Sequence, residues 1–154
     1  MENAEKNAKR HVRVSVKAII IQDERILMIK YFFPDGMLYD LPGGGQNHGE
    51  TLTEALEREC MEELGAKVLV KDILFVHDFI SANHPQLINQ DEHGLKIEFE
   101  CELLSPIDYS IKGDEYQEAI EWLPIAELEN YPVHPSALAA TLKTRNKIYL
   151  GESF

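Results

Sequence analysis

The chain has 154 residues, of which 44% are hydrophobic, so it is long enough to bury one substantial core. Acidic side chains number 27 and basic ones 15, and the resulting formal charge of −12 argues against a long nucleic acid or an anionic membrane as partner. A small phosphorylated ligand is still allowed, because a bound metal ion reverses the local sign of the charge.

The N-terminal residues 1–10 are polar and carry acids, so we expect a flexible tail rather than a signal or transit peptide. No hydrophobic run reaches the length of a membrane span. Cys60 and Cys101 each fall in an apolar pattern, which favours buried free thiols over a disulfide. Because no repeat or linker-like segment divides the chain, we expect a single cytoplasmic domain over residues 1–154.

Two strands and a glycine segment are predicted first. Residues 12–20 alternate between hydrophobic and more polar side chains and predict a strand with one wetter face. Residues 25–32 predict a second, mostly buried strand, and a turn follows at residues 34–36. The chain then enters three consecutive glycines, residues 43–45, which predict a loop because glycine adopts backbone conformations closed to other residues.

A helix follows the glycines. It is predicted to begin after Thr51, which has the Thr-x-x-Glu spacing of a capping box, and to end at Gly65. At about 100° per residue, the hydrophobic side chains of this helix form one stripe that must face the core. The stripe consists of Leu52, Ala55, Leu56, Cys60 and Leu64.

The carboxylates of this helix do not all avoid that stripe. Glu54 and Glu57 fall on or beside the wet side, as most helical glutamates do, but Glu59 and Glu63 fall inside the stripe and Glu62 lies beside it. Carboxylates four residues apart repel each other, and they resist dehydration. We therefore expect a positive group among them, and a hard divalent cation with oxygen ligands fits best.

Three segments follow the helix. Residues 67–80 are rich in β-branched and aromatic side chains and predict one long bent strand or two short ones. The polar residues 81–92 predict a loop long enough to suggest function. Residues 95–104 alternate cleanly, which predicts a strand with one apolar face and one charged face. A charged strand face is usually solvated, and here it consists of Lys96, Glu98, Glu100 and Glu102.

The C-terminal third predicts shorter elements. A second polar segment, residues 105–117, precedes a short strand over residues 118–123 and a short helix that begins at Pro124. Residues 136–143 predict another helix, and residues 147–150 a last strand. Strands and helices are mixed without regular βαβ alternation, which favours an α+β fold with a mixed sheet.

The glycine segment and helix together resemble a known motif. Gly44, Glu50 and the run from Arg58 to Ala66 are similar to the Nudix box, G-x5-E-x7-R-E-U-x-E-E-x-G-U, where U is a bulky apolar residue. Every fixed position is filled, and Cys60 and Ala66 are mild departures at the two U positions. The stretch around Trp122 also resembles the tryptophan-to-helix segment of this family.

The resemblance implies an α/β/α sandwich with a mixed central sheet. It also implies hydrolysis of a nucleoside diphosphate linked to another moiety, with Mg²⁺, or sometimes Mn²⁺, as cofactor. The substrate would be a small nucleotide derivative. The implied metal ligands are Glu59, Glu62, Glu63 and a backbone carbonyl at Gly43.

The resemblance also implies supporting roles for residues around the metal ligands. Arg58 matches the arginine that orients a box glutamate, and on a helix it can reach Glu62. Glu50 matches a position that supports the glycine segment or adds an outer contact to the metal site. Gly43 and Gly44 match a tightly bent backbone that would receive the phosphates.

The proton acceptor and the substrate pocket are left open. Glu62 and Glu63 are candidates for the base that activates water, and so are the later residues Glu115 and Glu118. Candidates for lining a base or ribose pocket are Tyr39, Phe79, His77 and His84. Within this family, ADP-ribose hydrolases carry a proline and dinucleoside polyphosphate hydrolases a tyrosine at a fixed distance after the box. Residues 81–84 contain neither, so the substrate stays undefined.

Three functions compete. The leading hypothesis is a Mg²⁺-dependent pyrophosphohydrolase. The alternative is a catalytically weak nucleotide-sensing module, which the complete set of box residues argues against. An acidic calcium-binding or structural domain is disfavoured because no Asp-rich EF-hand loop is present. A homodimer is left open as the oligomeric state.

Overall fold

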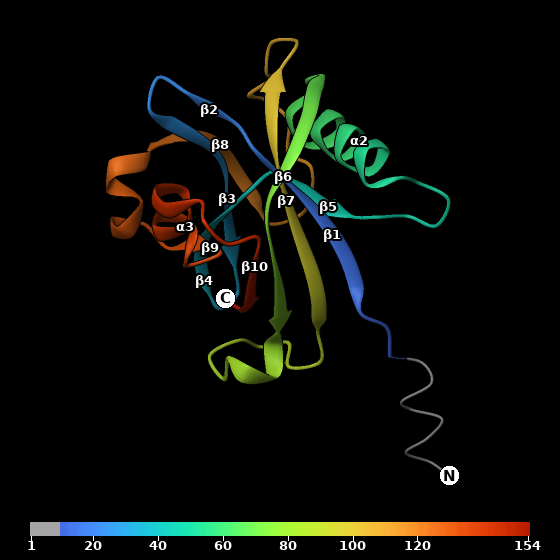
Figure 1. Cartoon of the computed structure of the whole chain (residues 1–154), viewed down its shortest axis with the longest axis vertical. Helices are drawn as coiled ribbons and strands as arrows, with labels where there is room; N and C mark the ends of the chain where they lie inside the picture. Colours follow the sequence, from blue (N-terminus) through green and yellow to red (C-terminus); the bar gives the residue numbers. More distant parts are fainter. Residues whose placement is uncertain (1–9) are drawn as a thin grey trace.

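The structure is a computed structural model that describes residues 10–154, so the predicted tail lies outside the described residues apart from Arg10. The described chain forms two five-stranded sheets with helices on either side (Figure 1). Elements carry the labels of Figure 1.

The first sheet has the strand order β10-β6-β7-β1-β5. The central strands β1 and β7 are parallel, whereas β5 is antiparallel to β1 and β6 is antiparallel to β7, so the sheet is mixed. Its strands are β1 (Arg13–Ile19), β5 (Gly43–Gly45), β6 (Val68–Ile80), β7 (His93–Leu103) and β10 (Tyr149–Glu152). The predicted long strand after the helix is thus a single strand, β6, with irregular pairing near its middle.

The second sheet is built around β3, which pairs with β2, β4 and β8, while β9 adds to β4. Its strands are β2 (Ile21–Gln22), β3 (Arg25–Phe33), β4 (Gly36–Asp40), β8 (Gln117–Pro124) and β9 (Val133–His134).

Helices cover the outer sides of the strands. Helix α2 (Leu52–Leu64) packs into one buried cluster with β1 and β7, and helix α3 (Leu138–Thr144) packs into a second cluster with β3 and β4 (Figure 1). Two short 3-10 helices, η1 (Ser81–Asn83) and η2 (Ile125–Asn130), complete the fold. The α+β class with helices on both sides of mixed strands is confirmed, although the strands divide between two sheets.

The predicted helix signals are confirmed. Thr51 and Glu54 form both hydrogen bonds of the capping box, and Gly65 ends α2 in the left-handed conformation. The apolar stripe is buried except at Leu52, which is partly buried, and Cys60 and Cys101 are both free and buried.

Two predictions about strands are wrong. Residues 43–45 form the edge strand β5 rather than a loop. Their backbone groups are hydrogen-bonded by pairing with β1, and three glycines have no side-chain pattern from which a strand could be predicted. The charged face of β7 is not solvated throughout, since Glu98 is only 1% exposed. A sheet face that another sheet covers is buried whatever its side chains.

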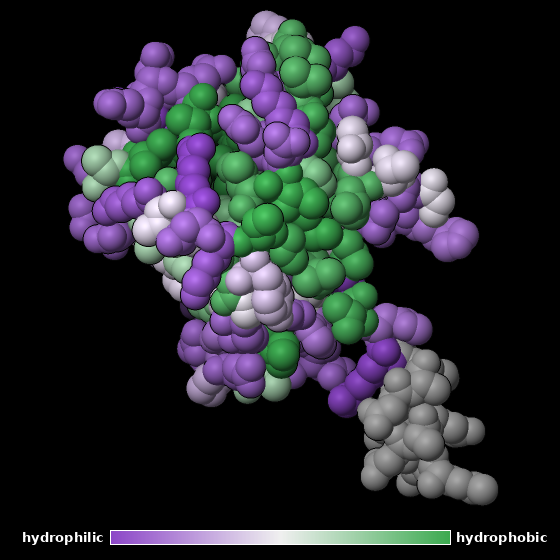
Figure 2. Space-filling view, viewed as in Figure 1, coloured by the Kyte–Doolittle hydropathy of each residue, from purple (hydrophilic) through white to green (hydrophobic). Residues whose placement is uncertain are grey.

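On the face shown in Figure 2, hydrophobic side chains gather over the middle of the molecule and hydrophilic ones surround them. No helix within residues 10–154 is long and apolar enough to cross a membrane.

Candidate active site

The candidate site lies where α2 packs against the edge strand β5. The Glu63 side chain is buried, and its Oε2 accepts a hydrogen bond of 3.3 Å from the Gly43 amide. The Glu59 carboxylate lies against Gly44, where an added Cβ would be 2.6 Å from the carboxyl carbon. Both glutamates that helical phase placed in the apolar stripe therefore touch the glycine strand, whereas the Glu62 side chain is 57% exposed.

The glycines of β5 are required because neighbouring groups lie very close to their backbone. Gly43 has φ of 137°, and a Cβ there would lie 2.0 Å from the carbonyl oxygen of Val16. No side chain fits that space, and at Gly44 a side chain would displace the Glu59 carboxylate.

The Arg58 side chain connects carboxylates of the site to the glycine strand through hydrogen bonds. Its guanidinium donates two hydrogen bonds to Glu50, at 2.7 and 2.9 Å, and a third to Glu59 at 2.8 Å. It also donates to the carbonyl of Gly45 at 2.9 Å. The predicted contact with Glu62 is present but longer, at 3.4 Å, so Glu50 and Glu59 are the main partners. These hydrogen bonds raise the pKa of Arg58 and lower that of Glu50.

Burial makes the Glu63 carboxyl a weak acid. Desolvation raises its pKa from an ordinary value of 4.5 to about 8, the ammonium of Lys17 and the Gly43 amide act against this rise, and the nearby Glu59 and Asp40 add to it. The site thus holds a buried carboxyl whose ionised form needs an additional positive neighbour.

The donor chemistry suits a hard divalent cation. Glu59, Glu62 and Glu63 supply carboxylate oxygens, and the glycine strand supplies carbonyl oxygens, which are the ligands that Mg²⁺ prefers. Within residues 10–154 no three acidic, histidine or cysteine side chains already converge in a metal-binding arrangement, and Arg58 binds two of these carboxylates. The raised pKa of Glu63 and the crowding by Glu59 nevertheless fit a cation.

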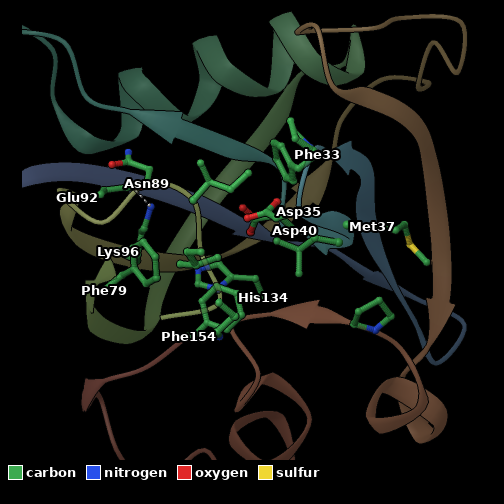
Figure 3. Close-up of a pocket in the computed structure, with 17 residues that line it drawn as sticks. Phe33, Asp35, Met37, Asp40, Phe79, Asn89, Glu92, Lys96, His134 and Phe154 are labelled. Atoms are coloured by element: carbon green, nitrogen blue, oxygen red, sulfur yellow. Dashed lines mark ion pairs between the residues drawn. The ribbon is translucent and has the colours of Figure 1, made fainter. Parts of the chain in front are cut away.

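A cleft of about 580 Å³ adjoins the site (Figure 3). Its hydrophobic walls include Phe33 from β3 and Phe79 from β6, and in the close-up the rings of Phe79, His134 and Phe154 lie together. Lys96 and Asp40 supply charged groups.

Lys17 connects the cleft to the glycine strand. Its ammonium donates to Asp40 at 3.1 Å and to the carbonyls of Leu41 and Gly43 at 3.3 and 3.4 Å. Although burial raises the pKa of Asp40, the charge of Lys17 holds it below its ordinary value. Asp40 in the cleft wall and Glu63 at the glycine strand therefore share one buried cation.

A buried histidine–glutamate pair lies on the same side of the first sheet as Lys17. Nε2 of His77 lies 2.8 Å from Oε1 of Glu98, and both side chains are fully buried. Burial raises the pKa of Glu98, and the contact with His77 opposes this. The His77 ring is 5.9 Å from the ring of His134, whose pKa burial lowers to about 4.

The substrate candidates differ in their positions. Phe79 lines the cleft, but Tyr39 does not, since it is buried in the second core cluster and its hydroxyl donates to Glu121 at 2.6 Å. Tyr39, which the sequence offered as a pocket residue, is thus not part of the lining of this cleft. His84 pairs with Glu152 at 2.7 Å.

The candidates for the proton acceptor also differ. Glu115 is exposed on a segment that covers Glu63, because a Cβ on Gly113 would lie 3.3 Å from Cγ of Glu63. Glu118 is exposed on β8. Neither makes a hydrogen bond to the box among the described residues.

Sequence reasoning missed Lys17, Asp40 and His134. The signal available for Lys17 was a single lysine in the buried part of a strand, where its neighbours are small or hydrophobic. Asp40 and His134 carried no local signal, because β4 and β9 bring them together only through pairing.

Comparison with known proteins follows this geometry. A family model described as NUDIX domain matches residues 11–143. An ADP-ribose pyrophosphatase of Methanocaldococcus jannaschii is 43% identical over 68 residues, which are 44% of this chain and 40% of that protein. The match thus spans only about two fifths of the length of this curated relative.

Solved structures agree on the fold. A Nudix hydrolase from Nitrosomonas europaea superposes with a TM-score of 0.70 and 22% identity, over 86% of this chain and 87% of that one. A MutT Nudix hydrolase from Burkholderia pseudomallei superposes with a TM-score of 0.65 and 27% identity, over 84% and 96% of the two chains.

Proposed function

The chain belongs to the Nudix hydrolase family, and we propose that it is a divalent-metal-dependent enzyme that cleaves the pyrophosphate linkage of a nucleoside diphosphate joined to another moiety. One observation carries this proposal, namely that buried carboxylates of α2 meet the glycine strand β5 beside a cleft of ligand size.

The cation would be held by Glu59, Glu62, Glu63 and the carbonyl of Gly43, and we propose Mg²⁺, with Mn²⁺ as the alternative. When bound, such a cation neutralises charge on phosphate oxygens and lowers the pKa of a water molecule. Arg58 holds Glu59 beside the glycine strand through a hydrogen bond of 2.8 Å and also reaches Glu62 at 3.4 Å.

A carboxylate must accept the proton of the attacking water. Glu63 is our first candidate, because its buried carboxylate lies against the glycine strand that would receive the phosphates. Glu62 is the second candidate from the box. Glu115 and Glu118 are the alternatives outside it, and Glu115 has the better position because its segment covers Glu63.

The cleft would hold the part of the substrate that carries the base or sugar. Phe79 and Phe154 offer flat hydrophobic surfaces, and His134 offers a neutral imidazole that can donate or accept one hydrogen bond. Gly43 and Gly44 would receive the phosphates without obstruction by side chains. The relative from Methanocaldococcus jannaschii makes ADP-ribose the first compound to test.

The test is a substrate panel. The protein is incubated with ADP-ribose, nucleoside triphosphates, dinucleoside polyphosphates and sugar nucleotides, in Mg²⁺ or in EDTA, and release of nucleoside monophosphate or phosphate is followed. We expect turnover of at least one nucleoside diphosphate derivative in Mg²⁺ and none in EDTA. Absence of metal-dependent turnover on the whole panel would overturn the enzyme reading, and nucleotide binding without turnover would favour the sensing module.

A further inference from the structure

Three basic side chains share one face of the first sheet, although the chain has a formal charge of −12. Arg13 and Lys17 are on the same face of β1 because side chains two residues apart along a strand point the same way. Ser15, between them, is the register partner of Lys96 on β7, which places Lys96 on that face too. Helix α2 packs against the opposite face.

Two glycines leave room around these cations. A Cβ on Gly45 would lie 2.6 Å from Nε and from one Nη of Arg13, and a Cβ on Gly94 would lie 3.2 Å from Cε and 3.5 Å from Nζ of Lys96. Gly94 is the register partner of Arg13, so the two cations are neighbours. The guanidinium and the ammonium therefore lie over bare backbone. We call this strip of the sheet, formed by Arg13, Gly45, Gly94 and Lys96, the trough.

The positive charges of the trough are only partly matched by carboxylates. Lys17 has Asp40 at 3.1 Å, but within residues 10–154 Arg13 has no ion pair, and the carboxylate nearest to Lys96 is Glu92 at 3.7 Å. The Lys96 side chain is only 13% exposed. Burial, followed by repulsion from Lys17, lowers the pKa of Lys96 although carboxylates oppose this, and Arg13 adds to the repulsion. An anion placed between Arg13 and Lys96 would relieve this repulsion.

The trough connects the two parts of the candidate site. Lys96 lines the cleft and extends toward Glu92 and Asn89 (Figure 3). At its other end, Arg13 lies over Gly45, whose carbonyl accepts a hydrogen bond from Arg58. A ligand that is bound in the cleft and reaches Gly45 along this face of the sheet would pass both cations.

We propose that Arg13 and Lys96 bind the phosphate groups of the substrate from the side of the sheet opposite α2. The inference rests on the proposed function for the identity of the ligand, a nucleoside diphosphate derivative. The planar guanidinium of Arg13 can hold two phosphate oxygens, while Lys96 acts as a point charge at the cleft end. Two strand residues outside the Nudix box thereby distinguish a phosphorylated compound from its nucleoside.

The experiment measures binding without catalysis. Isothermal titration calorimetry in EDTA at low salt compares inorganic pyrophosphate, AMP and UMP with adenosine and uridine. We expect pyrophosphate to bind and at least one nucleotide to bind about tenfold or more tightly than its nucleoside, with the preference falling as NaCl is raised.

Variants assign the effect to the trough. Lys96→Met and Arg13→Gln should each reduce the affinity for pyrophosphate about tenfold, and Lys96→Arg should retain it. Glu92→Gln should strengthen binding, since it removes the carboxylate beside Lys96. Lys71→Met is the matched control, because Lys71 pairs with Glu102 on the surface and should bind as wild type does. Circular dichroism melting verifies the fold, and Arg13→Gln, at an exposed position, serves if Lys96→Met does not fold.

Equal binding of nucleotide and nucleoside by the wild type would overturn the inference, and so would unchanged pyrophosphate affinity in both Lys96→Met and Arg13→Gln. With a substrate from the panel, Lys96→Met should raise KM about tenfold with kcat within about threefold of wild type. If the protein binds pyrophosphate in a way that depends on Lys96 but turns over no substrate, the role of the trough in phosphate binding is supported and the hydrolase function is removed. Metal-dependent turnover that neither Lys96→Met nor Arg13→Gln changes would support the hydrolase function and remove the role of the trough.

Discussion

Helix α2 and strand β7 both carry carboxylates into the interior, and they differ in what surrounds those carboxylates. Glu59 and Glu63 lie at the edge of the first sheet against glycine backbone, where the nearby cations Arg58 and Lys17 are part of the same site. Glu98 lies deep between the sheets and is closed in by His77.

The difference separates a site open to a ligand from a sealed structural pair. The Glu59 and Glu63 carboxylates lie against the glycine backbone of β5, which has no side chain to stand between them and a ligand. The Glu98 carboxylate has the buried His77 imidazole as partner at Oε1, whereas Glu98 Oε2 and His77 Nδ1 have no hydrogen-bond partner among the described residues. Loss of either side chain leaves the other buried without this partner. The predictions below test this contrast between α2 and β7.

The largest effect is expected at α2. Glu63→Gln keeps the size of the side chain but removes its charge and basicity, so the rate of metal-dependent hydrolysis should fall by about 10²–10³-fold. Glu57→Gln, at an exposed position of the same helix, is the matched control and should keep wild-type activity. Initial rates at saturating Mg²⁺ measure both. Full activity of Glu63→Gln would remove Glu63 from the mechanism.

The largest loss of stability is expected at β7. Glu98→Ala leaves His77 buried without its partner and should lower the free energy of unfolding by about 3 kcal/mol. Glu102→Ala, on the exposed end of the same strand face, should change it by less than about 0.5 kcal/mol. Urea denaturation gives both values. Equal effects of the two substitutions would show that the His77–Glu98 pair is not structural.

His134 should make the fold sensitive to acid. Burial lowers its pKa from 6.5 to about 4, so its contribution to stability is fully present above about pH 6.5 and is lost as the pH falls toward 4. The loss amounts to at most about 3 kcal/mol. His134→Gln should flatten this part of the curve of unfolding free energy against pH. An unchanged slope between pH 6.5 and 4 would contradict the burial of a neutral imidazole.

Glu63 should have the opposite pH dependence without metal. Its folded-state pKa is raised to about 8, so its contribution to stability is complete below about pH 4.5 and is lost as the pH rises toward 8. In EDTA at pH 8, Glu63→Gln should therefore be more stable than wild type by about 1 kcal/mol, because it removes the crowded charge while losing the attraction of Lys17. A lower melting temperature of the variant would count against this account.

Local patterns in the chain predicted the parts of the site that one helix contains. The capping box at Thr51, the end at Gly65 and the phase of Glu59 and Glu63 all follow from the geometry of a single helix. The helical phase of Glu59 and Glu63 predicts a positive group beside them, and the guanidinium of Arg58 lies 2.8 Å from Glu59.

Strand patterns were less informative. Clean alternation in β7 separated two faces, but it could not say that the charged face is covered by the second sheet at Glu98. The glycine strand carries no side chains, so no alternation exists there to read. Tyr39 looked like a residue for a binding pocket, yet its hydroxyl is held by Glu121, a residue distant in the chain.

The sequence by itself determined the class of fold, the helix with its carboxylates and the family, because each depends on residues close together in the chain. Only the tertiary structure decided that Lys17 joins Asp40 to Gly43, that Phe79 and His134 share a cleft, and that Arg13 and Lys96 lie together over two glycines. These contacts depend on the pairing of β1 with β5 and β7, and such pairing brings together residues that are distant in the chain, which no local pattern encodes.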